Sequence, residues 1–446
     1  MRKILALALL GFVALGCSKA EPSASAAAKS AAPSPKVAPS ASAVEPKKPE
    51  PQRPYNVLFI MVDSLRADMP WTGYPRQIAP WLTEFGKRST FYPRSYSLSS
   101  YTAKSVVPTL VGKYPSEMRR DGYFFTRWFD DNLFISERAQ KAGLRTLAGH
   151  GHGYFLPNMG TNQGFDDYRL LPGTFLDTTG VHDITSDRLN KLAKEMLSDP
   201  KNVDQTGKKR FFAYFHFLDP HFTYIKHEED PDYGDKRRDL YDNEVHFTDR
   251  WVGDLVDWVD KQPFGKNTVV IITADHGEGF GERGQYRHAY QLWESLIRVP
   301  LFIRVPGAEP RRIEVSRSAI DLAPTMADLM GLPNDPPFRG KSLVPEVYGA
   351  KAEPRPVISD LPRCDLMDRR RALIDGDYAL IAFGDDNNFM LFDVVKDFKE
   401  ENDLAAKEPE KLKEMKALYE KLSADIPKEP VVGGVPLMGV SPSQRY

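Results

Sequence analysis

The stretch YNVLFIMVD at residues 55–63 is a continuous apolar run that follows a proline and ends on the acid Asp63. An apolar run of this length without polar alternation predicts a strand that is buried on both faces of a sheet. The stretch TVVIITADHG at residues 268–277 repeats the pattern and ends with Asp275 and His276 followed by a glycine. The two stretches therefore predict two central strands, each with ionisable side chains at its carboxyl end.

Helix-like and strand-like stretches alternate around these two runs. Residues 133–143 form a helical pattern before a strand pattern at 144–150. A second helical pattern, over residues 183–197, precedes a second strand pattern over residues 209–219. A longer helix, over about 238–261, has an apolar stripe with spacings of three and four residues, formed by Tyr241, Val245, Thr248, Val252, Leu255 and Val259. This alternation favours an α/β fold with an open parallel sheet between helices.

Ligands of open parallel sheets bind at the carboxyl ends of the strands. The strand-like stretches place several ionisable residues at those ends, namely Asp63, Asp219, His221, Asp275 and His276. We therefore expect the functional site at this edge of the sheet.

The C-terminal part has a different pattern. Residues 370–397 contain short strand-like runs broken by DGD and GDDNN, which are hairpin signals. Residues 407–422 have the apolar spacing of an amphipathic helix. We therefore expect a main domain over 55–345 and a small antiparallel subdomain over 346–446.

The first 54 residues are not expected to join the folded core. Residues 1–17 have a basic start and a short apolar run, which is typical of a signal peptide, and their Leu-Gly-Cys ending resembles a bacterial lipobox. We expect lipidation of Cys17, with ordinary secretion and cleavage near Ala20 as the alternative. Residues 18–54 are rich in Ala, Ser and Pro and contain no aromatic residue, which predicts a disordered tether.

These features predict an exported protein that is bound to a membrane through its N-terminal lipid. It would lie in the bacterial cell envelope, on the periplasmic or outer-membrane face, and Ser18 after the lipidated cysteine favours the outer membrane. Cys364, the second of two cysteines, then has no partner for an intramolecular disulfide. A formal net charge of −1 gives no electrostatic support for a nucleic-acid partner, and we expect none.

The stretch SYSLSSYTAKSVVPTLVGKYPSE at residues 95–117 has the pattern of a polar loop followed by a helix. Its hydroxyl side chains have two interpretations. Ser and Thr are common helix caps, and a hydroxyl at a helix start is also a candidate nucleophile.

Five of the nine histidines lie in segments that follow strand-like stretches, namely His150, His152, His216, His221 and His288. A single histidine is more often structural, but several at one sheet edge favour a functional site. Together with the aspartates they offer the oxygen and nitrogen ligands that suit Mn²⁺, Zn²⁺ or Mg²⁺.

From about residue 55 to residue 425 the chain resembles the sulfatase family of the alkaline phosphatase superfamily. NVLFIMVDSLRAD resembles the first strand with its metal-binding acid, and SSYTAKSVVPTLVGKYPSE resembles the nucleophile segment. AGLRTLAGHGHG, HFLDPHFTY and TADHGEGFGE follow in the family's order, and LFDVVKDFKEENDLA resembles its C-terminal region. The resemblance implies an α/β, alkaline-phosphatase-like fold, with a mixed, mostly parallel sheet flanked by helices and a small C-terminal antiparallel subdomain. Residues 55–345 would be the sulfatase-like catalytic domain.

The resemblance also implies roles for individual residues. It implies one divalent metal ion with the ligands Asp63, Thr102, Asp275 and His276. Thr102 falls where the family has its nucleophile, and Lys104 and Ser105 are expected to bind substrate. Four histidines are expected to bind the ester oxygens or protonate the leaving group, namely His150, His152, His221 and His288.

The chain departs from the family in the nucleophile motif. Sulfatases have Cys or Ser there, in the pattern Cys/Ser-x-Pro-x-Arg, and oxidise it to formylglycine. Threonine cannot form that aldehyde, and Lys104 and Val106 replace the Pro and Arg, so we expect no formylglycine. Ser64 and His276 stand where many sulfatases have a second Asp and an Asn. These changes favour Mn²⁺, Zn²⁺ or Mg²⁺ over Ca²⁺.

We therefore expect a metal-dependent, sulfatase-like hydrolase or transferase that acts on a phosphate, phosphonate or sulfate ester through Thr102. Phosphorus is favoured, because superfamily members that keep threonine mostly act on it. One alternative is sulfate-ester hydrolysis at an unmodified site, and another is a catalytically inactive surface-binding or scaffold lipoprotein. The substrate would be a small-molecule ester or a glycan or lipid ester, and no sequence pattern selects among these in the loops at 64–80, 117–132, 155–180 and 222–237.

Overall fold

A computed structural model of the chain describes residues 54–173, 185–429 and 431–433. The predicted signal peptide, Cys17 and the tether up to residue 53 lie outside the described residues, as does part of the loop at 155–180. Residues on both sides of the expected boundary at 345 belong to one compact unit, Pro51–Tyr446. That domain boundary therefore stays a prediction.

The two apolar stretches form adjacent strands at the centre of the main sheet. Strand β1 (Asn56–Val62) pairs in parallel with β5 (Phe211–Phe217) on one side and with β6 (Thr268–Ala274) on the other. All residues of these three strands are buried. Apolar side chains on both faces of the strands explain why the sequence lacks polar alternation here.

The main sheet has nine strands and is mixed, as the resemblance implied. Its order is β4-β3-β5-β1-β6-β7-β2-β8, and β9 also pairs with β2. The remaining strands of this sheet are β2 (Thr90–Tyr96), β3 (Arg145–His150), β4 (Asp167–Leu170), β7 (Arg298–Arg304), β8 (Arg311–Arg312) and β9 (Arg317–Ser318).

One edge of the sheet differs from the purely parallel arrangement that the strand–helix alternation favours. Strand β7 runs antiparallel to both β6 and β2. A parallel neighbour needs a long crossover connection, usually a helix packed on the sheet. The segment between β6 and β7 instead contains loops and only the short helix α6 (Glu294–Ile297), so the chain turns back antiparallel.

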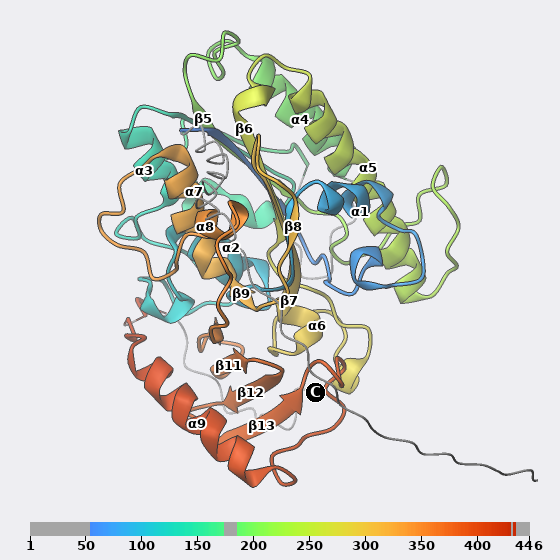
Figure 1. Ribbon diagram of the computed structural model, residues 1–446, viewed down its shortest axis with the longest axis vertical. Helices are drawn as coiled ribbons and strands as arrows, with labels where there is room; N and C mark the ends of the chain where they lie inside the picture. Colours follow the sequence, from blue (N-terminus) through green and yellow to red (C-terminus); the bar gives the residue numbers. More distant parts are fainter. Residues whose placement is uncertain (1–53, 174–184, 430, 434–446) are drawn as a thin grey trace, which may run out of the picture. The chain divides into compact units, whose positions relative to one another are not determined.

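Helices cover both faces of the sheet (Figure 1). Alternate residues of β1 belong to two different apolar clusters, with Phe59 in one and Ile60 in the other. The first cluster includes side chains of α2 (Thr102–Val111), α3 (Ile135–Lys141), α7 (Leu322–Met330) and α8 (Val344–Val347). The second includes side chains of α1 (Pro80–Lys87), α4 (Ser186–Ser198) and α5 (Arg237–Asp260).

The expected apolar stripe of the long helix is confirmed, because all of its residues are buried on α5. The stretch at 95–117 starts with the end of β2, continues as a loop into α2 and ends in a 3-10 helix over Pro115–Glu117. The ten residues of α2 are all buried. Helix α2 ends at Gly112, which has a φ of 71°, a left-handed conformation that glycine adopts without strain.

The expected C-terminal antiparallel sheet is confirmed. Its order is β10-β11-β12-β13, with bounds Val357–Leu361, Arg370–Asp375, Tyr378–Phe383 and Asn388–Asp393. Helix α9 (Pro409–Ala424) packs its buried Met415 and Tyr419 against this sheet. No helix within the described ranges is long and apolar enough to cross a bilayer.

A buried ion pair within the C-terminal sheet also hydrogen-bonds the segment after α2. Arg371 donates hydrogen bonds of 3.0 and 2.9 Å to Oδ1 of Asp360, and both side chains are buried. Oδ2 of Asp360 accepts the backbone N–H of Ser116 at 2.8 Å. Burial alone would raise the pKa of Asp360, but Arg371 and Ser116 lower it, so the carboxyl group stays charged.

We expect Arg371→Leu to lower the free energy of unfolding by about 3–5 kcal/mol, because it leaves the Asp360 charge buried without its partner. Urea unfolding followed by circular dichroism would measure the change. The double variant Asp360→Asn/Arg371→Leu should lose less than the sum of the two single changes. A loss below about 1 kcal/mol for Arg371→Leu would contradict the importance of this pair.

Candidate active site

The three central strands bring acidic and histidine side chains to one point at the carboxyl edge of the sheet. Asp63 follows β1 directly, and Asp275 follows β6 directly. His216 is in β5, where it pairs with Met61 of β1 in the register of the sheet. Because β1 lies between β5 and β6, parallel pairing places all three side chains together.

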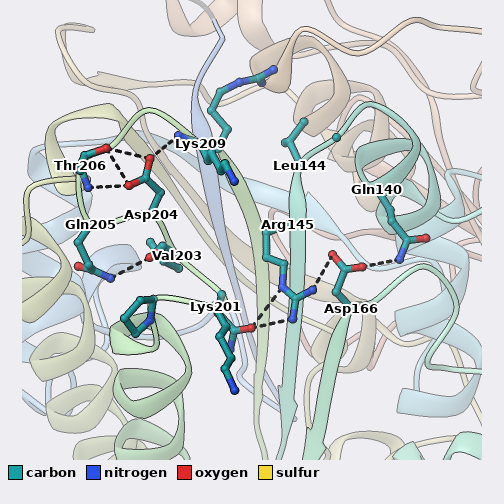
Figure 2. Close-up of a pocket in the computed structure, with 14 residues that line it drawn as sticks. Gln140, Leu144, Arg145, Asp166, Lys201, Val203, Asp204, Gln205, Thr206 and Lys209 are labelled. Atoms are coloured by element: carbon teal, nitrogen blue, oxygen red, sulfur yellow. Dashed lines mark hydrogen bonds and ion pairs between the residues drawn. The ribbon is translucent and has the colours of Figure 1, made fainter.

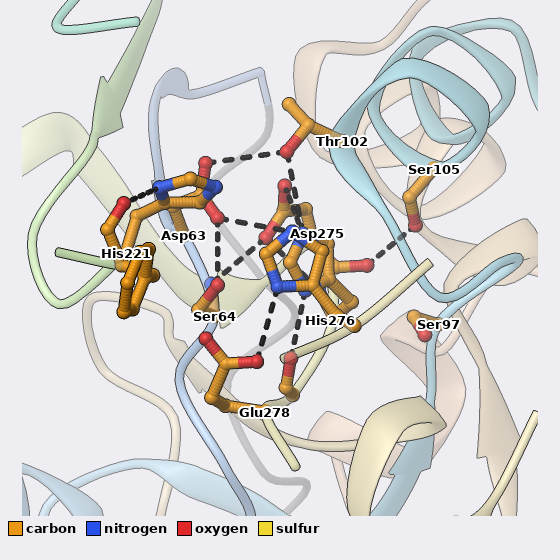
Figure 3. A network of polar contacts seen from close by, with 12 residues as sticks. Asp63, Ser64, Ser97, Thr102, Ser105, His221, Asp275, His276 and Glu278 are labelled. Carbon is orange, nitrogen blue, oxygen red and sulfur yellow. Dashed lines mark hydrogen bonds and ion pairs between the residues drawn. The ribbon is translucent and has the colours of Figure 1, made fainter. Parts of the chain in front are cut away.

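A hydroxyl and a second histidine complete this cluster (Figure 3). Thr102 is the first residue of α2, and its hydroxyl donates a hydrogen bond to Oδ2 of Asp63 at 3.2 Å. The same hydroxyl lies 3.3 Å from Nε2 of His276. Nε2 of His276 also lies 3.4 Å from Asp63 Oδ1 and 3.5 Å from Asp275 Oδ2. The structure therefore brings together Asp63, Thr102, Asp275 and His276, the predicted metal ligands.

The backbone around Asp63 is held in an unusual conformation. Ser64 has a φ of 59°, which a residue with a side chain rarely adopts. Its N–H donates to Asp275 Oδ1 at 3.3 Å, and its hydroxyl donates to Asp63 Oδ1 at 3.0 Å. The Tyr241 hydroxyl on α5 donates to the Ser64 carbonyl at 2.8 Å and fixes the turn from outside. These bonds hold the two carboxylates next to each other.

The two carboxylates have opposite pKa shifts. Burial and the Asp275 carboxylate raise the pKa of Asp63 well above its usual range. Burial also acts to raise the pKa of Asp275, but the His276 and His216 rings outweigh it and lower that pKa. Two neighbouring buried carboxylates repel each other unless a proton or a cation lies between them.

The polar atoms of the cluster fit a cation. Oδ2 of Asp275 and both ring nitrogens of His216 are buried and have no hydrogen-bond partner. Nδ1 of His276 lies 2.8 Å from the Gly277 carbonyl, which can only accept, so Nδ1 carries the proton and Nε2 presents its lone pair. Within the described part of the chain, ligand atoms of Asp63, His216 and Asp275 lie within 4.8 Å of one another.

Three further predicted histidines surround this cluster. Ligand atoms of His152 and His221 lie within 4.8 Å of each other and of one in Asp63. The ring of His288 has its centre 4.2 Å from that of His276 and 5.0 Å from that of His221. Burial lowers the pKa of His276 to about 4, and burial with His288 nearby lowers that of His221 to about 3. These two rings are therefore neutral at pH 7.

The proton positions of these rings differ. Nδ1 of His152 accepts the Tyr154 backbone N–H at 2.8 Å, so the ring proton lies on Nε2. Nδ1 of His221 lies 2.7 Å from the Phe222 carbonyl, and Nδ1 of His288 lies 3.1 Å from a Glu278 carboxylate oxygen. Both of these Nδ1 atoms therefore donate, which leaves a lone pair on Nε2 in a neutral ring.

The structure places two other predicted residues, His150 and Lys104, apart from this network. His150 is buried among Phe155, Tyr168 and Tyr214, and neither of its ring nitrogens has a hydrogen-bond partner. Burial and the His216 ring lower the pKa of His150 well below its usual value. The catalytic role expected for His150 stays a prediction.

Lys104 and Ser105 point in different directions from α2. The ammonium group of Lys104 is buried, hydrogen-bonds the Thr126 hydroxyl and lies over the Trp128 ring. Burial, with Arg120 nearby, lowers the pKa of Lys104 to about 7. The Ser105 hydroxyl donates to the Asp275 carbonyl at 2.5 Å and so braces the end of β6. Substrate binding by these two residues stays a prediction.

Two residues of the site were not predicted from the sequence. His216, in FHFLDPH, has no predicted role of its own, and its position in a strand beside β1 could have identified it. Glu278 is fully buried, accepts from the Tyr224 hydroxyl at 2.8 Å and orients His288. It lies three residues after Asp275 in TADHGEG, and this short spacing could have identified it.

A separate cavity of 730 Å³ lies at the amino ends of β3 and β5, at the opposite edge of the sheet (Figure 2). Arg145 in this cavity donates to Asn202 at 2.9 Å and pairs with Asp166 at 3.7 Å. None of the predicted catalytic or metal-binding residues lines it. A cavity of this volume therefore does not by itself mark the candidate site.

Comparisons with known proteins place the chain among sulfatases. The family model described as Sulfatase matches residues 55–332, and the model described as N-sulphoglucosamine sulphohydrolase, C-terminal, matches residues 281–428. A choline-sulfatase of Rhizobium meliloti is 26% identical over 66% of this chain and 72% of its own length. An ulvan-active sulfatase of Formosa agariphila is 24% identical over 64% of this chain and 62% of its own length.

A solved structure gives the same fold. The phosphonate monoester hydrolase of Silicibacter pomeroyi aligns with a TM-score of 0.66 over 84% of this chain and 96% of its own. At 20% sequence identity this likeness concerns the fold alone.

We expect Zn²⁺ or Mn²⁺ to raise the melting temperature of the chain, because a cation that binds only the folded state stabilises it by about 2.7 kcal/mol at 100 times its dissociation constant. Asp275→Asn should abolish most of this shift, as measured by differential scanning calorimetry with and without a chelator. Asp377→Asn is the matched control, because that exposed carboxylate pairs with Arg94 outside the cluster. An equal shift in all three proteins would contradict the cation site.

Proposed function

Because the chain belongs to the sulfatase family, we propose that it is a metal-dependent ester hydrolase or phospho-group transferase that acts through Thr102. The observation that carries this proposal is the position of the Thr102 hydroxyl, which starts a helix and contacts both Asp63 and His276. A hydroxyl in such a cluster is a nucleophile that neighbouring groups can activate.

The metal ion would be held by Asp63, Asp275 and His276 together with Thr102. His216 also faces this position and has unpartnered ring nitrogens. Carboxylate and imidazole ligands without any thiolate suit Mn²⁺, Zn²⁺ or Mg²⁺. A divalent ion bound there supplies Lewis acidity, which favours the deprotonated hydroxyl and balances the negative charge of the ester.

The surrounding residues supply orientation and a proton. The Asp63 carboxylate accepts the Thr102 hydrogen bond and so fixes the direction of the hydroxyl. The start of α2 offers backbone N–H groups that have no partner within the helix and that favour an anionic oxygen. His152 has its proton on Nε2, which suits donation to the oxygen of the leaving group.

The chain's own residues favour phosphorus esters over sulfate esters. Threonine cannot be converted to formylglycine, and Lys104 and Val106 replace the residues of the modification motif. A direct attack by Thr102 on a phosphate or phosphonate ester requires no modification. The second candidate is a sulfate ester, which the choline-sulfatase and ulvan-active sulfatase relatives support by their names. A small-molecule, glycan or lipid ester fits equally with the site as described.

We expect Thr102→Ala to lower turnover of the preferred ester by about 1,000-fold or more, because it removes the attacking oxygen. The assay would offer the full chain an aryl sulfate, a phosphate monoester, a phosphate diester and a phosphonate ester, with Mn²⁺, Zn²⁺ or Mg²⁺ added in turn. Thr102→Ser is the matched control, because it keeps the hydroxyl and should retain part of the activity.

The outcomes of this assay distinguish the proposed function from its two alternatives. Phosphorus-ester turnover that is lost in Thr102→Ala supports the proposal, and an added phospho-group on Thr102 in a quenched reaction would identify the nucleophile. Turnover of the aryl sulfate alone would favour the second candidate. No turnover of any ester, and no binding of metal, would favour a binding or scaffold protein instead.

We further propose that Cys17 is lipidated and anchors the chain to the bacterial cell envelope through the tether at 18–54. The variant Cys17→Ala should shift the protein from the membrane fraction to the soluble fraction and should no longer incorporate labelled palmitate in cells. An unchanged distribution would favour ordinary secretion with cleavage near Ala20.

A further inference from the structure

The cavity at the amino ends of β3 and β5 carries an excess of positive charge (Figure 2). Its charged lining residues are four basic and two acidic ones, namely Arg145, Lys201, Lys209, Arg210, Asp166 and Asp204. We call this surface the amino-edge groove. The whole chain has a formal net charge of −1, so the positive charge of the groove is a local feature. A local excess of positive charge favours an anionic partner.

Hydrogen bonds within the chain already occupy both acidic groups of the groove. Asp204 accepts the Thr206 hydroxyl at 2.7 Å and the backbone N–H of Lys209 at 3.0 Å. Asp166 accepts the Thr146 backbone N–H at 2.9 Å. These two carboxylates therefore hold the backbone around them, and they do not neutralise the lysine side chains.

The lysines of the groove have no carboxylate partner. Lys201 and Lys209 line the groove, and Lys208 precedes Lys209 in the same loop. All three are exposed, and within the described ranges none of their ammonium groups forms an ion pair. A lysine ammonium group has three donors on a flexible stem. These groups can therefore turn toward an anion at the surface.

The two arginines of the groove are held in place at adjacent strand ends. The Arg145 backbone N–H donates to the Arg210 carbonyl at 3.1 Å. The Arg145 guanidinium donates to Oδ1 of Asn202 at 3.2 and 2.9 Å, and its contact with Asp166 is longer, at 3.7 Å. The Arg210 guanidinium donates to the Met330 carbonyl at 2.6 Å. Guanidinium groups that are oriented mainly by neutral oxygens keep other N–H groups for a phosphate oxygen.

The N-terminal segment enters the domain at the same edge of the sheet. Tyr55 directly precedes β1, and its backbone N–H donates to the Leu329 carbonyl at 2.9 Å. The next carbonyl along α7, that of Met330, is the one that Arg210 binds. The predicted tether of residues 18–54 therefore joins the domain at the edge that carries the groove. A flexible chain of that length spans about 35 Å, which leaves the direction of the domain to be set by other contacts.

We propose that the amino-edge groove binds phosphate headgroups of an anionic bilayer, the membrane to which the lipid on Cys17 anchors the chain. Lipid phosphates match the fixed guanidinium groups and the free ammonium groups of the groove. Because the anchor keeps the domain close to the bilayer, a weak electrostatic contact is enough to orient it. The inference rests on the proposed lipid anchor for its occupant and is independent of the ester chemistry.

This contact would direct the candidate active site away from the bilayer. The groove lies at the amino ends of the strands, whereas Asp63 and Asp275 follow the carboxyl ends of β1 and β6. A strand of seven residues such as β1 spans about 23 Å. Esters of soluble or extended molecules would therefore reach the site, and headgroups of the same bilayer would not.

The test measures how fast individual lysines react with an amine-acylating reagent. The full chain is added to vesicles of phosphatidylcholine alone, or of phosphatidylcholine with an equal part of phosphatidylglycerol, and modified lysines are quantified by mass spectrometry. We expect Lys201, Lys208 and Lys209 to react more slowly on the anionic vesicles and to regain their rates at high salt. Lys413 and Lys421, which are exposed on α9, are internal controls and should react equally on both.

Variants test the contribution of charge. Lys201→Gln/Lys209→Gln should lower the ratio of docked to free domain about 30-fold, because each lysine near an anionic surface contributes a factor of about five. The protection of Lys208 reports this ratio. The matched control Lys413→Gln/Lys421→Gln removes the same charge from α9 and should leave that protection unchanged. All four substituted lysines are exposed, so both variants should fold.

Several results would overturn the inference. Equal reactivity of the groove lysines on both vesicle types would exclude a contact that depends on lipid charge, and so would protection that persists in Lys201→Gln/Lys209→Gln. The same protection by inorganic phosphate without vesicles would indicate a site for a free anion instead of a bilayer.

Failure of the anchor is distinguishable from failure of the groove, because flotation of the vesicles reports the anchor separately. A chain that floats with neither vesicle type would contradict lipidation of Cys17. Lysine protection by an excess of anionic vesicles would then still support binding of anionic headgroups by the groove, and its absence would overturn it.

Discussion

The proximity of two carboxylates, Asp63 and Asp275, is the constraint on which the site depends. They meet because β1 and β6 are parallel neighbours that both end at the same height. The Ser64 backbone, in a left-handed conformation, donates to one carboxylate while the Ser64 hydroxyl donates to the other. Bringing two such groups out of water is costly, and a cation between them offsets that cost. The two buried carboxylates therefore lower the stability of the fold, and the proposed cation would offset this cost.

The hydrogen-bond partner of each Nδ1 determines which atom the imidazole presents at Nε2. The three rings of His221, His276 and His288 donate Nδ1–H to oxygen atoms, whereas His152 accepts a backbone N–H at the same atom. A neutral ring that donates at Nδ1 presents a lone pair at Nε2, whereas His152, which accepts at Nδ1, presents a proton there. Histidines of the same chemical type can in this way differ in the atom that they present to the site.

The position of Thr102 at the start of α2 follows from the packing of that helix. Helix α2 is buried along its whole length, so its first residue is fixed by packing rather than by the loop before it. Under the proposed function, the Thr102 hydroxyl would present the attacking oxygen without an oxidised side chain. Lys104, in place of the family's proline, is buried toward Thr126 and Trp128 and so does not face the cluster.

Much of the fold follows from local patterns. The apolar runs at 55–63 and 268–277, the stripe of α5 and the hairpin signals after residue 370 each depend on neighbouring residues, and each formed the expected element. The antiparallel strand β7 did not follow from strand–helix alternation, because its direction depends on whether the preceding segment packs as a crossover helix.

The sequence by itself determined which residues end the central strands, and so it placed Asp63, Asp275 and His276 at one edge of the sheet, while the family resemblance singled out Thr102. Only the tertiary structure decided that His216 and Glu278 belong to the same site, that Lys104 lies apart from it, and which nitrogen of each histidine carries the proton. The physical reason is that strand ends are a local property of the chain. Register between strands, and the hydrogen-bond partner of a ring, depend on residues that are distant in sequence and meet only when the sheet is assembled.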